Sequence, residues 1–234
     1  MRSPQEVARP AGCAEFSTYF LVRRVACGRA HTVAIDYFGR LWGWGANDHG
    51  QLALPKSNKQ FLLPQRVSPD NVISTDVFCG ADETFLCTSN GALCFGANAN
   101  GRLGVGGDGT DAEVPCPLKL GDGSDPVMIS SRGGHTLALN AAGDLWAWGS
   151  NLRGQLGIDD TRAQARPVRV SYFANGSVVA ASAGELFSVA LDKDYKLWCW
   201  GQGGHPNPTV PPGDNSQSAS LSTPVAIDVA ALAQ

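Results

Sequence analysis

Short apolar stretches in this 234-residue chain follow a period of two, which is typical of β-strands. Val33 and Ile35 alternate with Thr32 and Ala34, and residues 136–139 repeat the same pattern. Both sides of these stretches are apolar or small, as in strands that other sheets cover on each face. We therefore expect strands that need neighbouring sheets on both sides.

The same unit recurs along the chain at a fixed spacing. His31, Glu83, His135 and Phe187 occupy equivalent positions, each 52 residues after the previous one. Self-similarity at a fixed period indicates a repeat architecture in which each unit buries its core against its neighbours. Four copies of this unit cover nearly the whole chain.

A second strand is predicted after a turn at residues 36–39. It covers residues 41–45 in the first copy, 145–149 in the third and 197–201 in the fourth. All six Trp of the chain lie in these three stretches, in pairs separated by one small residue. One face of each strand therefore carries indoles, and the other allows close approach of a neighbouring backbone.

The second copy is one residue shorter between its two strands. Its second strand is predicted at residues 92–96, with Leu93 and Phe95 on the face that carries indoles in the other copies. The pair Asn90-Gly91 favours a two-residue type I′ hairpin. We predict that this tight turn explains the shorter spacing.

A connecting loop with the pattern Asn-x-x-Gly-Gln/Arg-Leu follows three of these strands. Its copies begin at Asn47, Asn98 and Asn151. Asn and Gly at this spacing supply left-handed backbone and hydrogen bonds from side chain to main chain. Short outer strands are predicted at residues 64–67, 115–118, 167–170 and 224–227.

The composition supports an all-β protein with a buried core. Hydrophobic residues make up 43% and charged residues 17% of the chain, and 28 of the 234 residues are Gly. The net charge of −3 leaves no basic surface for many phosphates, so direct binding of nucleic acid is not expected. No apolar run reaches the length that spans a membrane, and seven Cys without a CxxC pair indicate reduced thiols. We expect a protein inside the cell, in the cytoplasm or nucleus.

The residues that often carry chemistry are interpreted as structural. His31 and His135 share a repeat position with Glu83 and Phe187, which does not suit a site built from two imidazoles. His49 and His205 lie in loops without a Cys or carboxylate at ligand spacing, and residues 104–109 lack the Lys-Ser or Lys-Thr end of a phosphate-binding loop. We therefore predict no catalytic residue, no cofactor and no metal ion.

Three further groups of residues have a structural interpretation beside a functional one. Asp108, Asp111, Asp122 and Asp125 lie in Gly-rich loops that do not match a calcium loop, so they are interpreted as turn carboxylates. Cys27 and Cys79 share a position with Ser131 and Ala183, as packing residues do. Arg153, Arg162, Arg166 and Arg169 form either a solvated face or a contact for an acidic partner.

The combined pattern Gly-x-x-His-Thr-x-Ala, then Trp-x-Trp-Gly-x-Asn-x-x-Gly-Gln-Leu, resembles the regulator of chromosome condensation repeat family. It recurs in near-full form at residues 28–54 and 132–158, and the resemblance covers residues 16–232. It implies a β-propeller of four-stranded blades, usually seven to a ring. Residues 1–15 then form an N-terminal tail, and the Pro-rich residues 202–222 form a loop within the last repeat.

Four repeats are fewer than the usual ring contains, so the expected structure is a partial or open propeller. The end blades would each leave one face for a neighbour to cover. Self-association, blades from another chain, a strained four-blade closure or a longer parent chain would each cover those faces. We favour the last possibility or blades from another chain.

The resemblance implies two functional classes. The first, which we favour, is a non-enzymatic protein-interaction or scaffold module that forms part of a larger assembly. The alternative is a guanine-nucleotide exchange factor or regulator for a small GTPase, as the founding member of the family is for Ran. The plant UV-B photoreceptor branch carries a Trp two residues before the repeat His, where this chain has Arg29 and Gly133, so photoreception is not expected.

The repeat positions that we expect to hold the blades together are glycines, aromatic residues and polar loop residues shared by the copies. They are Gly28, His31, Trp42, Trp44, Gly45, Asn47, Gly50, Gln51, Gly80, Gly96, Asn98, Gly101, His135, Trp146, Trp148, Gly149, Asn151, Gly154, Gln155, Trp198, Trp200 and Gly201.

Overall fold

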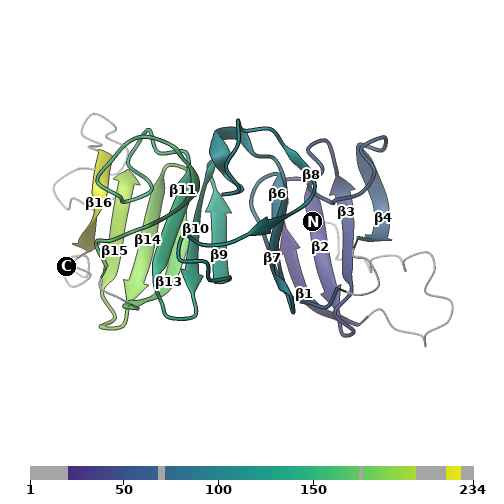
Figure 1. The fold of residues 1–234 in the computed structure, drawn as a ribbon, viewed down its shortest axis with the longest axis horizontal. Helices are drawn as coiled ribbons and strands as arrows, with labels where there is room; N and C mark the ends of the chain where they lie inside the picture. The colour runs from purple at the N-terminus through teal and green to yellow at the C-terminus, as the bar shows by residue number, and fades with distance from the viewer. Residues whose placement is uncertain (1–20, 68–71, 174–175, 204–219, 228–234) are drawn as a thin grey trace, which may run out of the picture. The chain divides into compact units, whose positions relative to one another are not determined.

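The protein folds into four sheets of four consecutive strands each (Figure 1). The computed structural model describes residues 21–67, 72–173, 176–203 and 220–227. The N-terminal tail expected at residues 1–15 and most of the expected Pro-rich loop lie outside the described residues. The prediction of an all-β fold built from four-stranded propeller blades is confirmed.

The strands of each blade follow one another in sequence. Blade 1 contains β1 (Val22–Cys27), β2 (His31–Asp36), β3 (Leu41–Ala46) and β4 (Gln60–Arg66). Blade 2 contains β5 (Ser74–Cys79), β6 (Glu83–Thr88), β7 (Gly91–Gly96) and β8 (Ala112–Leu118). A short 3₁₀ turn, η1 (Ala99–Gly101), lies between β7 and β8.

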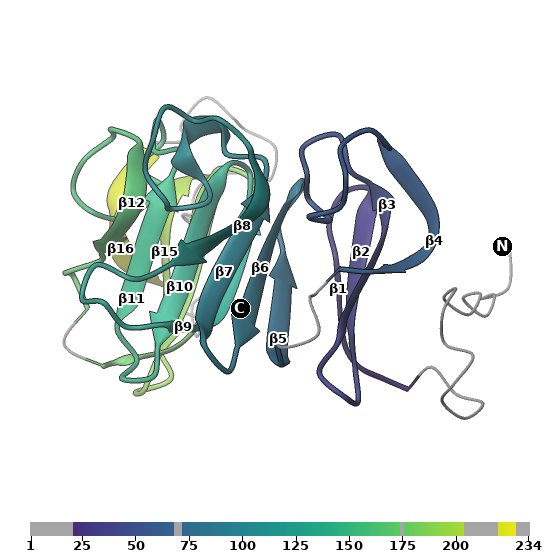
Figure 2. The same cartoon turned by 45° about the vertical axis from the view of Figure 1, so that its right-hand side comes forward.

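The second half of the chain repeats this order. Blade 3 contains β9 (Pro126–Arg132), β10 (His135–Asn140), β11 (Leu145–Gly149) and β12 (Gln164–Arg169). Blade 4 contains β13 (Val178–Ala183), β14 (Phe187–Asp192), β15 (Leu197–Gln202) and β16 (Ser220–Ile227). Figure 2 shows the same sheets from another side.

The chain divides into two compact units. One contains residues 1–97 and 111–116, and the other contains residues 98–110 and 117–234. Blade 1 and the first three strands of blade 2 therefore lie in the first unit, and blades 3 and 4 lie in the second.

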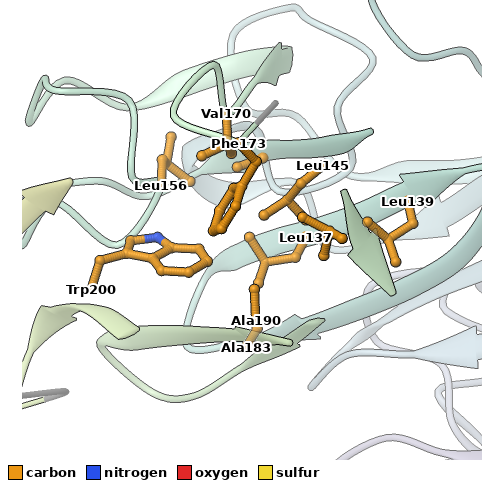
Figure 3. Close-up of a cluster of buried hydrophobic side chains, with 11 residues drawn as sticks. Leu137, Leu139, Leu145, Leu156, Val170, Phe173, Ala183, Ala190 and Trp200 are labelled. Carbon is orange, nitrogen blue, oxygen red and sulfur yellow. The ribbon is translucent and has the colours of Figure 1, made fainter. Parts of the chain in front are cut away.

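Each unit has its own hydrophobic core, formed where one blade packs against the next. In the first unit, Val77 of β5 packs into a cluster with Val33, Ile35 and Leu41 of blade 1. In the second unit, side chains of β13 to β15 pack onto blade 3. Figure 3 shows Trp200 beside Leu156 and Phe173, and the Phe173 and Trp200 ring centroids are 6.0 Å apart. Burial between sheets is the main favourable contribution to such a stack.

In each blade a glycine follows the last aromatic residue of the third strand, because no side chain fits there. Gly149 has φ +97°, and a Cβ at this position would lie 2.5 Å from the Gly134 carbonyl oxygen. Gly45, Gly96 and Gly201 have the same left-handed backbone and the same close carbonyl. Only Gly adopts this conformation without strain and leaves room for the neighbouring strand.

The predicted type I′ turn in blade 2 is wrong. Thr88 pairs with Gly91, so the loop residues are Ser89 and Asn90, and Asn90 lacks the positive φ that a type I′ turn requires. The Thr88 hydroxyl accepts a hydrogen bond from the Asn90 N–H and donates to the Gly91 carbonyl. This side chain moves the loop one position toward the N-terminus.

The outer strands begin three or four residues earlier than predicted. The predictions placed a proline at the start of each strand, but β4 already begins at Gln60, ahead of Pro64. Pro115, Pro167 and Pro224 likewise lie inside β8, β12 and β16. Each of these strands is at the edge of its sheet, where a missing N–H is tolerated.

Candidate functional site

The repeat histidines hydrogen-bond to the following blade. His31 Nε2 lies 3.0 Å from Thr84 Oγ1, and His135 Nε2 lies 2.8 Å from Ser188 Oγ. All four side chains are buried. Each hydroxyl belongs to the residue that directly follows the repeat position in the next copy of the unit.

Backbone carbonyls of the connecting loops accept hydrogen bonds from these hydroxyls. Thr84 Oγ1 donates to Gln51 O at 2.8 Å, and Ser188 Oγ donates to Gln155 O at 2.7 Å. A hydroxyl has one proton, so its oxygen accepts the hydrogen bond from the histidine. The neutral His31 and His135 rings therefore carry their protons on Nε2.

The second Trp of a blade donates to the same kind of carbonyl. Trp200 Nε1 donates to Gln155 O at 2.8 Å, and Trp148 Nε1 donates to Arg102 O at 2.8 Å. Thr136 Oγ1 also donates to Arg102 O, at 2.9 Å. We call the combination of a loop carbonyl with the hydroxyl and indole that bind it the carbonyl clamp.

The Asn of each loop holds the carbonyl in place. Asn151 Oδ1 accepts from Leu156 N at 2.9 Å, and Asn151 Nδ2 donates to the carbonyls of Asp160 and Arg162. Asn47 and Asn98 accept in the same way from the leucine five residues later. These buried amides replace the backbone hydrogen bonds that an irregular loop lacks.

Burial fixes the charge of the histidines. Desolvation lowers the pKa of His31 from 6.5 to about 4, against a smaller raising effect of Asp82. Desolvation also lowers the pKa of His135 to about 4. Both rings are therefore neutral near pH 7, and each can donate from Nε2 in this form.

Blade 1 carries the donors of a carbonyl clamp without the carbonyl. Thr32 and Trp44 occupy the positions of Thr136 and Trp148. Within the described residues, Thr32 Oγ1 has a hydrogen-bond contact with Cys27 Sγ alone, at 3.8 Å, and none of these residues accepts a hydrogen bond from Trp44 Nε1. Trp44 is half-buried, whereas Trp148 and Trp200 are fully buried.

The first strand of blade 1 is exposed where its counterparts are buried. Val25 of β1 is 62% exposed, whereas the equivalent Val77 and Ile129 are 4% and 5% exposed. Val77 is covered by blade 1 itself. The face of blade 1 formed by Val25, Thr32 and Trp44 is called the blade-1 face below.

Blade 4 has an open face as well. Val189, Leu191 and Leu197 are partly exposed, whereas their counterparts in blades 1 and 3 are buried. Phe187, in the position of the repeat histidine, is 36% exposed. Each unit therefore has one apolar blade face that is not fully covered within the described residues.

The other residues considered from the sequence have local contacts. His49 Nδ1 lies 2.7 Å from Asp111 Oδ2, a contact between residues 62 positions apart that local spacing could not predict. Asp108 and Asp122 accept hydrogen bonds from the hydroxyls and, with a smaller effect, from the backbone N–H groups of Thr110 and Ser124, and these hydrogen bonds lower their pKa values. No group of three metal-binding side chains occurs among the described residues.

Burial makes Cys79 and Cys94 poor nucleophiles. Burial raises the pKa of Cys79 to about 12 and raises that of Cys94 further. A nucleophilic cysteine requires the opposite shift.

Two arginines of the run considered from the sequence form ion pairs: Arg162 pairs with Asp160, and Arg169 pairs with Asp144. His205 lies outside the described residues.

The hydroxyls of the clamp were not identified from the sequence, although a signal was present. Thr32, Thr84, Thr136 and Ser188 place a hydroxyl at the same position in all four copies. The preceding repeat position, which holds His, Glu, His and Phe in the four copies, varies more than the hydroxyl position. A hydroxyl retained in every copy of a buried strand requires a hydrogen-bond partner, which the loop carbonyl provides.

The blades and their shared clamp define a β-propeller repeat protein. The sequence model of the regulator of chromosome condensation (RCC1) repeat matches residues 39–87 and 142–191, and a second model of the same repeat matches residues 22–51. The chain belongs to the regulator of chromosome condensation repeat family. In the described part of the chain, no helix has the length and apolar character needed to cross a membrane.

Two curated relatives are from Arabidopsis thaliana. The ultraviolet-B receptor UVR8 is 34% identical over 184 residues, which are 78% of this chain and 41% of UVR8. The mitochondrial RCC1 domain-containing protein RUG3 is 32% identical over 187 residues, which are 77% of this chain and 42% of RUG3. The chain thus spans about two fifths of the length of these relatives.

Solved structures show the same fold. The structure of Prp20p from Saccharomyces cerevisiae matches with a TM-score of 0.77 and 21% identity, over 93% of this chain and 52% of that chain. Human WBSCR16 matches with a TM-score of 0.72 and 20% identity, over 90% of this chain and 55% of that chain. Prp20p binds Gsp1p and histones.

Proposed function

We propose that this chain is a non-enzymatic protein-interaction module that associates with a protein partner through the open faces of its end blades. One observation carries the proposal: Val25 is 62% exposed at a position that is 4% exposed in blade 2, where a neighbouring blade covers it. An apolar face shaped to pack against a blade favours association with protein. The free state of the six described cysteines fits a protein of the cytoplasm or nucleus.

The proposal is tested on the full 234-residue chain by native mass spectrometry at several concentrations. We expect assemblies that grow with concentration, because the open apolar faces associate when no partner covers them. Val25→Asp should reduce this association. Val179→Asp is the matched control, because Val179 is also an exposed valine on the first strand of a blade. A chain that stays monomeric at every concentration and melts cooperatively would contradict the proposal.

The alternative function is nucleotide exchange on a small GTPase, which the family resemblance suggests. The binding of Prp20p to Gsp1p is consistent with a protein partner for a propeller of this kind. The test is the release of fluorescent GDP from a panel of small GTPases in the presence of the full chain. Accelerated release would favour exchange activity, and unchanged release by a folded sample would leave the interaction module as the better account.

A further inference from the structure

We infer that the connecting loop after β7 and the turn between β9 and β10 form a binding site for one phosphate group. Its donors are the side chains of Asn100, Arg102 and Ser150, which lie around Gly134. We call these four residues the phosphate site. All of them belong to the second compact unit. Binding there does not depend on the open blade faces of the proposed function.

Side chains from separate segments of the chain meet beside Gly134. A Cβ on this glycine would lie 3.7 Å from Arg102 Nη2, 4.0 Å from Asn100 Nδ2 and 3.6 Å from Ser150 Cβ. Gly134 has φ +88°, a left-handed conformation that favours glycine, so no side chain fills the space between these groups. A guanidinium, an amide and a hydroxyl-bearing carbon therefore lie within about 4 Å of one point.

Arg102 replaces the glutamine that closes the loops of blades 1 and 3. Gln51 Oε1 accepts a hydrogen bond from His49 N at 2.9 Å, and Gln155 Oε1 accepts one from Arg153 N at 2.9 Å. A guanidinium has no acceptor, so Arg102 cannot form this hydrogen bond. The loop after β7 therefore lacks a bond that stabilises the other two loops.

The backbone of the same loop departs from the other copies. Asn100 has φ +60°, whereas its counterparts His49 and Arg153 do not have positive φ. Positive φ is uncommon for residues other than Gly, and departures of this kind are concentrated at functional sites. Here the departure accompanies the placement of the Asn100 amide and the Arg102 guanidinium beside one glycine.

A phosphate monoester suits these donors better than a carboxylate does. It carries nearly two negative charges near pH 7 and has three terminal oxygens, whereas a carboxylate has two oxygens and one charge. Arg102 Nε donates to Ala99 O at 3.0 Å, and the Nη groups supply further donors for an anion. Asn100 and Ser150 can donate to the remaining phosphate oxygens.

The surrounding charges favour a single phosphate over an extended acidic segment. Arg132, on the same turn, adds a positive charge, but its Nε lies 3.8 Å from Glu185 Oε2. Asp108 directly precedes Gly109, where a Cβ would lie 3.9 Å from Asn100 N. Because these two carboxylates repel a long acidic segment, the site suits one compact anion.

The test is a titration of the full 234-residue chain with sodium phosphate near pH 7, followed by NMR of the backbone amides. The ionic strength is held constant, because salt screens exposed charges. We expect saturable shifts of the Gly134 and Ser150 amides, with a Kd of about 1 mM. Acetate should bind about tenfold more weakly, because it offers fewer oxygens and less charge.

Two variants carry residues that other copies of the repeat already hold. Arg102→Gln introduces the residue found in the loops of blades 1 and 3, and Ser150→Ala introduces the residue found at Ala46 and Ala97. Arg102→Gln should weaken phosphate binding by about tenfold or more, since it removes the charge-assisted hydrogen bonds. Ser150→Ala should weaken it less. Arg162→Gln is the matched control, because it removes one exposed positive charge elsewhere and should leave the affinity unchanged.

Urea unfolding separates a binding role of Arg102 from a structural one. A glutamine at this position can accept from the Asn100 N–H, as Gln51 accepts from His49 N. Arg102→Gln should therefore unfold at the same or a higher urea concentration. A clear loss of stability would show that the arginine serves the fold, and would overturn the inference.

The remaining outcomes decide the ligand. No saturable shift, or an equal loss of affinity in Arg162→Gln, would overturn the inference, and equal affinity for acetate would overturn the assignment to phosphate. A phosphothreonine peptide and its unphosphorylated form distinguish two sources of the group. Binding of the phosphorylated form alone supports a site for a phosphorylated protein, whereas binding of inorganic phosphate without either peptide supports a site for free phosphate.

Discussion

His135 of blade 3 and Ser188 of blade 4 form a buried hydrogen bond of 2.8 Å, and the Ser188 hydroxyl donates a hydrogen bond to the Gln155 carbonyl. The Ser188 side chain thereby joins β14 of blade 4 to β10 of blade 3 and to the connecting loop that contains Gln155. The repeat histidine is a structural group in this arrangement, and its neutral ring is part of the packing between blades.

Removal of the clamp hydroxyl should destabilise the second unit. Ser188→Ala leaves His135 Nε2–H buried without an acceptor, so we expect a loss of about 1–3 kcal/mol in the free energy of unfolding. Ser182→Ala is the control, because Ser182 lies on an exposed part of blade 4. Denaturant unfolding of both variants measures the difference. Equal stabilities would argue against the clamp.

The stability of the protein should fall in acid through its histidines. The unfolded chain binds a proton at each histidine near pH 6.5, whereas folded His31 and His135 bind one only near pH 4. Stability from these groups is therefore present above pH 6.5 and is lost as the pH falls toward 4. The loss is about 3 kcal/mol for each histidine.

The measurement is the free energy of unfolding from pH 7 to pH 4 for the natural chain and for the double variant His31→Gln, His135→Gln. Carboxylates titrate in both proteins, so the difference between the two curves isolates the contribution of the two histidines to the free energy of unfolding. A difference that does not change with pH would mean that the rings are not held neutral.

Two equivalent tryptophans should respond differently to truncation. Trp148→Ala should cost about 3–5 kcal/mol, since this indole is fully buried and donates to Arg102 O. Trp44→Ala should cost less than half as much, because Trp44 is half-buried and has no acceptor among the described residues. Thermal melts of the two variants compare them, and equal losses would contradict the open blade-1 face.

Two glycines separate backbone strain from steric exclusion. Gly149 and Gly123 both have positive φ, but a Cβ would meet the Gly134 carbonyl at Gly149 and nothing within 4 Å at Gly123. We expect Gly123→Ala to cost about 1–2 kcal/mol from strain alone. Gly149→Ala should cost clearly more. Urea unfolding of both variants tests this order, and a smaller loss at Gly149 would contradict the close strand contact.

The sequence was sufficient to predict the blades because their signals are local and repeated. The alternation around Val33 and the 52-residue spacing depend only on neighbouring residues in the chain. The prediction for the Asn90-Gly91 turn failed because the Thr88 side chain bonds the loop backbone and shifts the pairing. Turn type follows from such competition and not from the dipeptide alone.

The candidate site was less accessible to prediction because its atoms come from different blades. The carbonyl of Gln155 is a backbone atom, which no sequence pattern marks as an acceptor. The contact of His49 with Asp111 joins residues far apart in the chain. The different burial of Trp44 and Trp148 depends on whether a preceding loop covers them, which identical Trp-x-Trp patterns cannot show.

The most direct test of the account is hydrogen exchange of the tryptophan indole N–H groups in the unmodified 234-residue chain, followed by NMR. We predict slow exchange for Trp148 and Trp200, whose Nε1 atoms donate to Arg102 O and Gln155 O, and fast exchange for Trp44. Slow exchange of Trp44 in a monomer would contradict the open blade-1 face, and fast exchange of Trp148 or Trp200 would contradict the carbonyl clamp.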